Sequence, residues 1–196
     1  MLKSGRGEVA WKPTGLWSLA PGFKSRPRPS VMVNNLVRVQ ISVLTPKHQT
    51  EFFKAYEKVF SSREEVETFY GRFVENGWVS GALKDGELVG VLTWAPREAV
   101  KHGLAEIVDF WVRAEERRKG IGRKLIDHAL FQMQRYYKRF GAKLKKIMLF
   151  TGVVDRFLAA RNLYEKKGFR VVATIPKNAL DNPYGDDLLY VLEITP

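Results

Sequence analysis

The sequence predicts a mixed α/β fold, in which a central twisted sheet is flanked by helices and the first half of the sheet is antiparallel. Two short β-rich stretches meet at Asp85-Gly86, a dipeptide that is typical of tight antiparallel hairpins. The longest helical pattern, over 120–140, lies between two further strands, and such a crossover requires those strands to be parallel. Hydrophobic residues make up 45% of the 196 positions, which is enough for a sizeable core.

The first half of the chain combines strands with two helices. Residues 36–44 alternate in polarity and predict a strand. Thr45-Pro46 has the residue types of a helix start, and Ser62 with Glu65 forms a capping-box pattern that opens a second helix. The strands expected after that helix are 78–84, 87–94 and 105–112.

The second half begins with the helix at 120–140. Its apolar side chains recur at helical spacing, and we interpret this stripe as core: Ile121, Leu125, Ala129, Met133, Tyr136, Tyr137 and Phe140. The remaining expected elements are a strand at 146–151, a helix capped by Asp155 and running to about Lys167, and strands at 169–175 and 188–194 joined by the turn-rich loop 178–187.

The net charge of +12 is unevenly distributed. Residues 1–34 carry six basic side chains and one acidic side chain, and residues 113–146 carry twelve basic and three acidic side chains. This surplus predicts an anionic partner such as nucleic acid, a phosphate group or a membrane surface; a solvated lysine-rich surface is the alternative. We expect residues 1–34 to be a basic, proline-containing arm and residues 35–196 to be the folded domain. The tryptophans of the arm indicate that part of it packs on the domain or on a second subunit, as in a homodimer.

Composition excludes several classes of site. The chain has no cysteine, which rules out disulfides, thiolate zinc sites and cysteine nucleophiles. Its three histidines are far apart in sequence, so we expect no metal centre. No apolar run is long enough to span a membrane and no signal-peptide pattern is found, and we therefore expect a cytoplasmic protein without a membrane partner.

A basic loop with two glycines lies between the strand that ends at Val112 and the following helix. The start of a helix presents unpaired N–H groups and a partial positive charge, so a phosphate group fits there. The loop lacks the Lys-Ser/Thr pair of a Walker motif, and Leu125 stands where a dinucleotide fingerprint needs a third glycine. The pattern that remains is Arg117-x-x-Gly120-x-Gly122.

This loop resembles the acyl-CoA-binding motif of the GNAT superfamily of N-acetyltransferases, in which a strand precedes Gln/Arg-x-x-Gly-x-Gly/Ala and a helix follows. Residues 160–169 are similar to the family's second signature, Ala-x-x-Leu-Tyr-x-x-x-Gly-Phe. The order of elements also matches, so the resemblance covers about residues 36–194. The sequence departs from the pattern at Phe157, where many members carry an asparagine; any polar contact of that asparagine to the cofactor must come from elsewhere.

The resemblance implies transfer of an acetyl group from acetyl-CoA to a primary amine. It also implies a parallel strand pair that splays at the cofactor site, so that the pantetheine arm pairs with exposed backbone. The residues implied in binding are Phe110, Trp111 and Val112 beside the thioester, where a backbone N–H would stabilise the oxyanion, and Arg117, Arg118, Lys119, Gly120, Ile121, Gly122 and Arg123 around the pyrophosphate.

An amine acceptor is mostly protonated at neutral pH, so a base is useful. Glu106 is the first candidate, because it lies sixteen residues before Gly122, where some family members place a catalytic glutamate. Asp109 is the second candidate, and period-2 alternation places it on the opposite face of the same strand. Tyr164 occupies the family's general-acid position, from which a phenol would protonate the leaving thiolate.

The sequence leaves the acceptor and two other functions open. Trp94, Trp111 and the loop 178–187 are candidates for the acceptor pocket by position alone, although we expect Trp78 and Trp94 to be core. The alternatives to an acetyltransferase are a nucleic-acid-associated protein that uses the basic arm and helix, and a catalytically silent CoA-binding regulator on the same fold.

Overall fold

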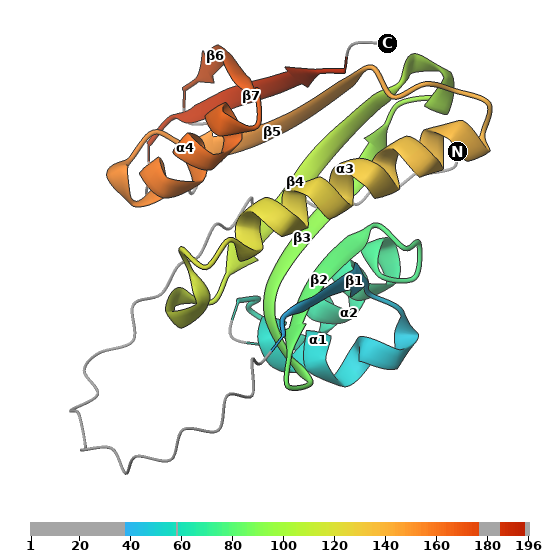
Figure 1. Cartoon of the computed structure of the whole chain (residues 1–196), viewed down its shortest axis with the longest axis vertical. Helices are drawn as coiled ribbons and strands as arrows, with labels where there is room; N and C mark the ends of the chain where they lie inside the picture. The colour runs from blue at the N-terminus through green and yellow to red at the C-terminus, as the bar shows by residue number, and fades with distance from the viewer. Residues whose placement is uncertain (1–37, 58, 177–184, 195–196) are drawn as a thin grey trace, which may run out of the picture.

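The computed structural model describes residues 38–57, 59–176 and 185–194, so the arm 1–34 and most of the loop 178–187 lie outside the described residues. The described residues form one sheet in the order β1-β2-β3-β4-β5-β7-β6 (Figure 1). Its strands are β1 (Gln40–Val43), β2 (Val79–Lys84), β3 (Glu87–Arg97), β4 (Leu104–Val112), β5 (Lys146–Gly152), β6 (Arg170–Ile175) and β7 (Asp187–Glu193). The helices are α1 (Gln49–Tyr56), α2 (Arg63–Phe73), α3 (Ile121–Arg139) and α4 (Leu158–Lys166).

The pairing of the strands confirms the predicted fold class. All neighbouring strands are antiparallel except β4 and β5, which α3 connects as a parallel pair. The β2–β3 hairpin turns at Asp85 and Gly86, and both residues have positive φ, as that turn type requires. No helix among the described residues is long and apolar enough to cross a membrane.

The start of α2 is fixed by a local signal, whereas the start of α4 is not. The Ser62 side chain accepts a hydrogen bond from the Glu65 N–H and begins α2, while the Glu65 carboxylate accepts from the Ser61 N–H. The expected cap at Asp155 is wrong. Asp155 lies in a single 3₁₀ turn before α4, and the residue that flanks α4 is Phe157, which makes no side-chain cap. Tertiary packing holds this end, since the Phe157 side chain is buried against Gly152.

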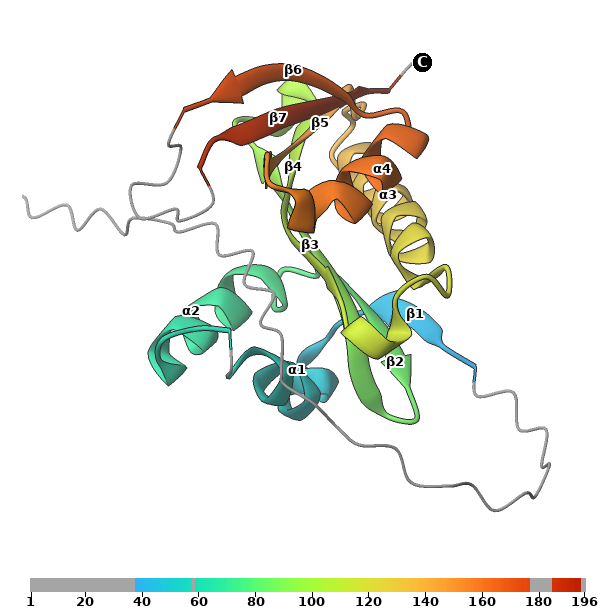
Figure 2. The ribbon, with the colours of Figure 1, turned by 90° about the vertical axis from the view of Figure 1, so that its left-hand side faces the viewer.

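Helices cover the two faces of the sheet in pairs: α1 and α2 lie on one face, and α3 and α4 lie on the other (Figure 2). The α3–α4 face has a core that includes Leu125, Met133 and Tyr164, and the α1–α2 face has an aromatic core around Phe52, Tyr56 and Phe69 in the first helices. We therefore refer to these surfaces of the sheet as the α3–α4 face and the α1–α2 face.

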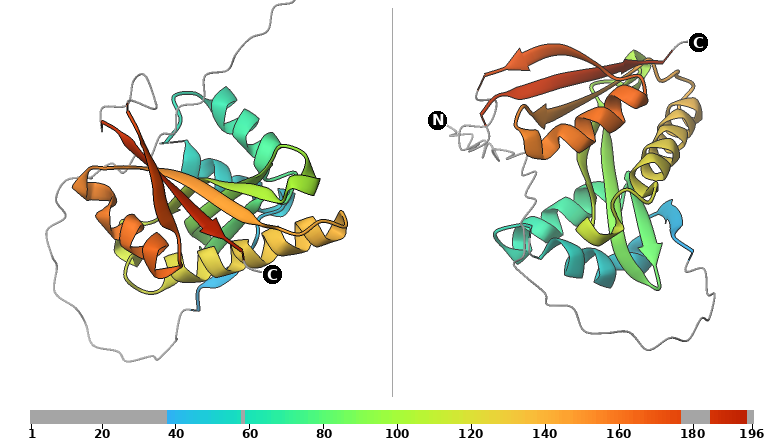
Figure 3. Two further views of the ribbon diagram at one scale, coloured as in Figure 1. Left: turned by 90° about the horizontal axis from the view of Figure 1, so that it is seen from above. Right: turned by 60° about the vertical axis from the view of Figure 1, so that its left-hand side comes forward.

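The parallel strands β4 and β5 separate part-way along their length. They pair from Leu104 opposite Lys146 to Ile107 opposite Leu149, although β4 continues to Val112 and β5 to Gly152. Beyond that point β5 swings away with β7 and β6 from the β1–β4 part of the sheet (Figure 3). The expected splay is thus confirmed, and it leaves the β5-facing backbone edge of residues 108–112 without a strand partner from β5.

The expectation that Asp109 and Glu106 lie on opposite faces of β4 is wrong. The β3–β4 register shifts so that Thr93 pairs with Asp109 and Trp94 with Ile107, which leaves Val108 as an extra residue on β4. Such a bulge reverses the period-2 alternation beyond it. Ala105, Ile107, Phe110 and Val112 accordingly pack on the α3–α4 face, whereas Val108 and Trp111 pack on the α1–α2 face.

Candidate functional site

The loop after β4 presents a run of unpaired backbone donors. Gly120 adopts a left-handed conformation (φ 80°, ψ 0°) and precedes the first residue of α3. Among the described residues, no backbone N–H from Arg118 to Arg123 donates to another protein group; the first donor after the loop is Lys124, which bonds to the Gly120 carbonyl. These N–H groups and the helix dipole make the loop suited to an anionic group such as a pyrophosphate.

Glycine at position 122 allows the first turn of α3 to approach the sheet. A Cβ atom there would lie 3.1 Å from Leu163 Cδ2 on α4 and 3.2 Å from Phe110 Cζ on β4. Both distances are tighter than ordinary van der Waals contact. The two glycines of the motif therefore have different roles: Gly120 supplies a backbone conformation and Gly122 a close approach.

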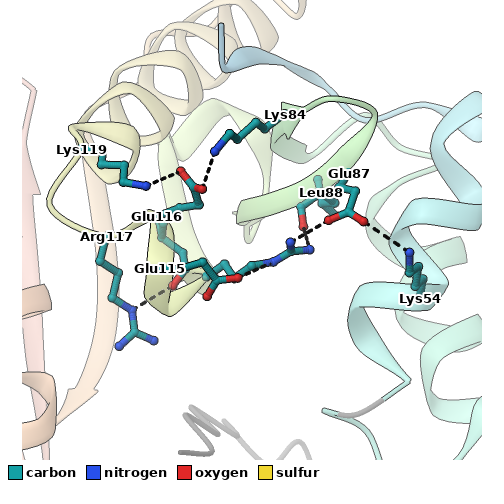
Figure 4. Close-up of polar contacts among 10 residues, drawn as sticks. Lys54, Lys84, Glu87, Leu88, Glu115, Glu116, Arg117 and Lys119 are labelled. Carbon is teal, nitrogen blue, oxygen red and sulfur yellow. Dashed lines mark hydrogen bonds and ion pairs between the residues drawn. The ribbon is translucent and has the colours of Figure 1, made fainter. Parts of the chain in front are cut away.

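Acidic side chains anchor this loop to the β2–β3 hairpin (Figure 4). Glu116 is 6% exposed and accepts from Lys84 Nζ at 2.7 Å and from Lys119 Nζ at 3.2 Å. Arg113 donates to Glu87 at 2.8 Å and to the Leu88 carbonyl at 3.1 Å. Glu116 was missed by the sequence reasoning, which treated the loop only by its basic residues.

The basic side chains of the loop are thus not equivalent. Arg117 Nε donates to the Val112 carbonyl at 2.9 Å and ties the loop to the end of β4, Lys119 is paired with Glu116, and Arg123 Nε lies 3.9 Å from Asp127. Arg118 has positive φ (61°), is exposed, and has no ion-pair partner in the described part of the chain. Arg118 is therefore the side chain most available to an incoming phosphate.

Glu106 lies on β4 just before the strands separate, with an 18% exposed side chain. Arg97 of β3 forms an ion pair with Glu106 at 3.0 Å. The positive charges of Arg97 and of Arg72 on α2 both favour the ionised carboxylate and so lower its pKa. Burial nevertheless raises the pKa of Glu106, because desolvation outweighs the two arginines. A carboxylate with a raised pKa is a better proton acceptor than an ordinary glutamate.

Asp109 lies two residues beyond the last β4–β5 pair and faces α1. Tyr56 at the end of α1 donates its hydroxyl hydrogen to Asp109 Oδ2 at 2.5 Å. Burial raises the pKa of Asp109 to about 6, against the opposing effects of the Tyr56 hydroxyl and the Phe110 N–H. The bulge at Val108 therefore brings both candidate carboxylates to the α1–α2 face. Tyr56 is a second residue that the sequence reasoning missed, since its helical spacing indicated only core.

Tyr164 projects from α4 toward β4, with its ring centroid 6.0 Å from that of Phe110. The residue is 5% exposed, and within the described segments its hydroxyl has no hydrogen-bond partner. Burial, followed by the charge of Asp109 and then by Tyr190, raises its pKa above the usual range. Tyr164 is thus protonated at neutral pH and has a hydroxyl free to donate.

The tryptophans divide between the two faces. Trp94 is 1% exposed in the α3–α4 core, where its ring lies 5.5 Å from that of Tyr136, so it is core as expected and does not line the α1–α2 face. Trp111 lies on the α1–α2 face with its ring 5.9 Å from that of Tyr56. Most of the loop 178–187, the third candidate for an acceptor pocket, lies outside the described residues.

Solved structures share this fold at low sequence identity. The chain matches Ard1 from Thermoplasma volcanium with a TM-score of 0.62 and 18% identity, covering 81% of this chain and 99% of the other. It matches the ribosomal-protein-S18-alanine N-acetyltransferase from Escherichia coli with a TM-score of 0.61 and 17% identity, covering 81% and 96%. It also matches Arabidopsis thaliana Naa50 in complex with the bisubstrate analogue CoA-Ac-MVNAL, with a TM-score of 0.62 and 20% identity, covering 80% and 99%. No curated protein matches the sequence.

The solved structures show the fold, and a family model shows the family to which the chain belongs. The model described as the acetyltransferase (GNAT) family matches residues 45–169, well over half of the chain, and includes both glycines of the loop and Tyr164. The chain therefore belongs to the GNAT family of acetyltransferases, which transfer an acetyl group from acetyl-CoA.

Proposed function

We propose that the protein transfers the acetyl group of acetyl-CoA to a primary amine by direct attack in a ternary complex. One observation carries this proposal: β4 and β5 separate after Ile107, and β4 then leads directly into the loop with unpaired N–H groups. The pantetheine arm would pair with the open edge of Phe110, Trp111 and Val112, and the pyrophosphate would lie on the loop from Arg117 to Arg123.

Glu106 acts as the general base in this proposal, and Asp109 is the second candidate. The raised pKa of Glu106 and its partial exposure support a group that accepts a proton and passes it to solvent. Asp109 is ionised at neutral pH despite its pKa of about 6, so it too can accept a proton. Both lie on the face opposite α3 and α4, from which an acceptor amine would approach.

Tyr164 acts as the general acid that protonates the departing thiolate. Its hydroxyl has no competing hydrogen-bond partner among the described residues, and the absence of that partner supports a role beyond core packing. Its raised pKa keeps the proton on the phenol until the sulfur acquires negative charge.

A screen of amines with purified protein and acetyl-CoA tests this function. Release of free CoA thiol with one or more amines, together with a mass gain of one acetyl group on the acceptor, is the expected result. Tight acetyl-CoA binding without turnover on any amine would instead favour a catalytically silent CoA-binding regulator.

Nucleic-acid binding is a second candidate function, favoured by one observation. Five basic side chains near the end of α3 have no ion-pair partner within the described ranges: Arg135, Lys138, Arg139, Lys143 and Lys145. Unpaired cations on one segment are typical of a surface that contacts phosphates. Fluorescence anisotropy with labelled DNA and RNA at about 50 mM salt tests it, and the absence of binding there would refute it.

A further inference from the structure

The Tyr56–Asp109 pair joins two elements that neither motif of the family resemblance includes. Tyr56 is the last residue of α1 and is 1% exposed, and its hydroxyl donates to Asp109 Oδ2 at 2.5 Å. Its ring is held by Phe52 at a centroid distance of 4.4 Å and by Trp111 at 5.9 Å. Packing on both sides fixes the phenol, so the hydrogen bond in turn fixes the orientation of the carboxylate.

The polar surroundings of this pair indicate a site for a polar ligand atom. Burial, followed by Asp109, raises the pKa of Tyr56, and Trp111 and Thr93 oppose this rise only in part. Neither Trp111 Nε1 nor Thr93 Oγ1 makes a hydrogen bond of normal geometry. Both atoms are buried without a partner, and Thr93 itself is fully buried. Buried polar atoms are normally paired, so these two atoms are available to a water molecule or a substrate group.

Asp109 has the Tyr56 hydroxyl as its hydrogen-bond partner on the α1–α2 face. Burial, followed by the charge of Asp109, raises the pKa of Tyr56 and also that of Tyr164 on α4. The neighbouring acid on β4 is Glu106, which has its own partners in Arg97 of β3 and Arg72 of α2. Asp109 is thus the carboxylate that a phenol orients, whereas Glu106 is held by arginines.

The balance of protons in the proposed reaction requires two acceptors. A protonated amine loses two protons when it becomes an amide, and one proton is gained by the CoA sulfur. A thiol ordinarily has a pKa of about 8.5, well below that of Tyr164, so proton donation by Tyr164 alone would leave an unfavourable buried phenolate. Uptake of a proton from solvent by this phenolate removes the difficulty, and the second proton of the amine then needs an acceptor of its own.

We propose that Tyr56 is a positioning residue, which holds Asp109 in place as the acceptor of the amine's second proton. The inference rests on the function proposed above and deepens it. Glu106 takes the first proton from the ammonium and releases it to solvent. The free amine then forms its bond to the thioester carbon, and the carbon–sulfur bond breaks when the intermediate collapses.

The remaining transfers restore every side chain. Tyr164 gives its proton to the sulfur, and the nitrogen gives its second proton to Asp109. Asp109 then releases that proton to solvent, and the Tyr164 phenolate takes up a proton from solvent. The products are the amide, the CoA thiol and one proton in solvent, and no oxidant or other reactant is needed. Tyr56 contributes by keeping Asp109 ionised, because its hydroxyl lowers the pKa of that carboxyl.

The test compares Tyr56→Phe with a matched control, Tyr70→Phe. Tyr70 lies in the same aromatic cluster, with its ring 5.5 Å from that of Phe52, and among the described residues its hydroxyl has no hydrogen-bond partner. Two measurements are made on each variant: the pH profile of kcat/KM with acetyl-CoA and an amine found in the screen, and the pKa of Asp109 from its carboxyl ¹³C chemical shift.

We expect Tyr56→Phe to raise the pKa of Asp109 and to move the acidic limb of the pH profile upward by about one pH unit, while Tyr70→Phe matches wild type. Asp109→Asn should slow kcat, and the double variant should be no slower than Asp109→Asn alone, since Tyr56 acts through Asp109. A profile of Tyr56→Phe that coincides with that of Tyr70→Phe overturns the proposal. The proposal is also overturned if Tyr56→Phe lowers kcat by the same factor in the wild-type protein and in the Asp109→Asn variant.

Two further outcomes separate this proposal from the function on which it rests. Absence of turnover by wild type with every amine refutes the proposed function, and the ¹³C titration then tests the Tyr56–Asp109 coupling by itself. If Tyr56→Phe does not fold, Asp109→Asn decides the matter: a normal kcat with an unshifted pH profile overturns the proposal.

Discussion

Replacing Gly120 with alanine separates the role of the loop in binding from its role in stability. Gly120 has φ 80°, and a Cβ atom built on it would meet nothing within 4 Å. The substitution therefore creates no clash, and its whole effect comes from the left-handed backbone. An L-residue in that conformation costs about 1–2 kcal/mol, part of which is offset by the lower entropy of the unfolded chain.

Gly86 in the β2–β3 turn provides a matched control, because it has φ 79° and also has nothing within 4 Å of an added Cβ. We expect Gly120→Ala and Gly86→Ala to lower the free energy of unfolding by a similar amount, about 1 kcal/mol, which lowers Tm by about 2–4 °C in a chain of this size. Thermal unfolding followed by circular dichroism without ligand measures both effects.

The two variants should differ in acetyl-CoA binding. An alanine at 120 relieves its strain by turning the N–H groups at the start of α3 away from the ligand. Loss of one hydrogen bond to a charged phosphate weakens binding about tenfold or more. Isothermal titration calorimetry should show this loss for Gly120→Ala and an unchanged Kd for Gly86→Ala. Equal affinities in the two variants would refute the assignment of the pyrophosphate to this loop.

The remaining predictions concern the three titratable groups of the site. Tyr164→Phe should lower kcat by about a hundredfold while changing the acetyl-CoA Kd little, and an equal loss in both would indicate a packing role instead. Glu106→Gln should make the rise of kcat/KM with pH shallower, because one of the two carboxylates that must lose a proton is then absent; an unchanged profile would leave the role to Asp109 or to water. Asp109→Asn should stabilise the fold at pH 7. Because the folded-state pKa of Asp109, about 6, exceeds its ordinary value of 3.8, the folded protein binds this proton more tightly and loses stability as the pH rises between those values. Urea unfolding should show a gain of up to about 3 kcal/mol at pH 7 and almost none at pH 3.5, whereas a gain that is equal at both pH values would contradict the raised pKa.

Local patterns were sufficient for most of the fold. The capping box at Ser62, the turn at Asp85-Gly86 and the glycine before α3 each depend on a few neighbouring residues, so their conformations can be inferred without knowledge of the rest of the chain. The parallel pair also follows from local information, since a helix between two strands of one sheet must cross over. The expected cap at Asp155 failed because burial of Phe157 against Gly152, a tertiary contact, holds that helix end.

The sequence by itself determined the family, the loop that would bind the phosphates, and Glu106, Asp109 and Tyr164 as candidates for proton transfer. Only the tertiary structure decided how those groups are arranged. The bulge at Val108 depends on the register between β3 and β4, which no periodicity within β4 records, and it brings Asp109 to the same face as Glu106. The Tyr56–Asp109 hydrogen bond joins residues 53 positions apart, and Glu116 pairs with a lysine 32 positions away. Such contacts are set by packing between elements. A linear pattern therefore identifies the residue types, but not the partners that orient these side chains and shift their pKa values.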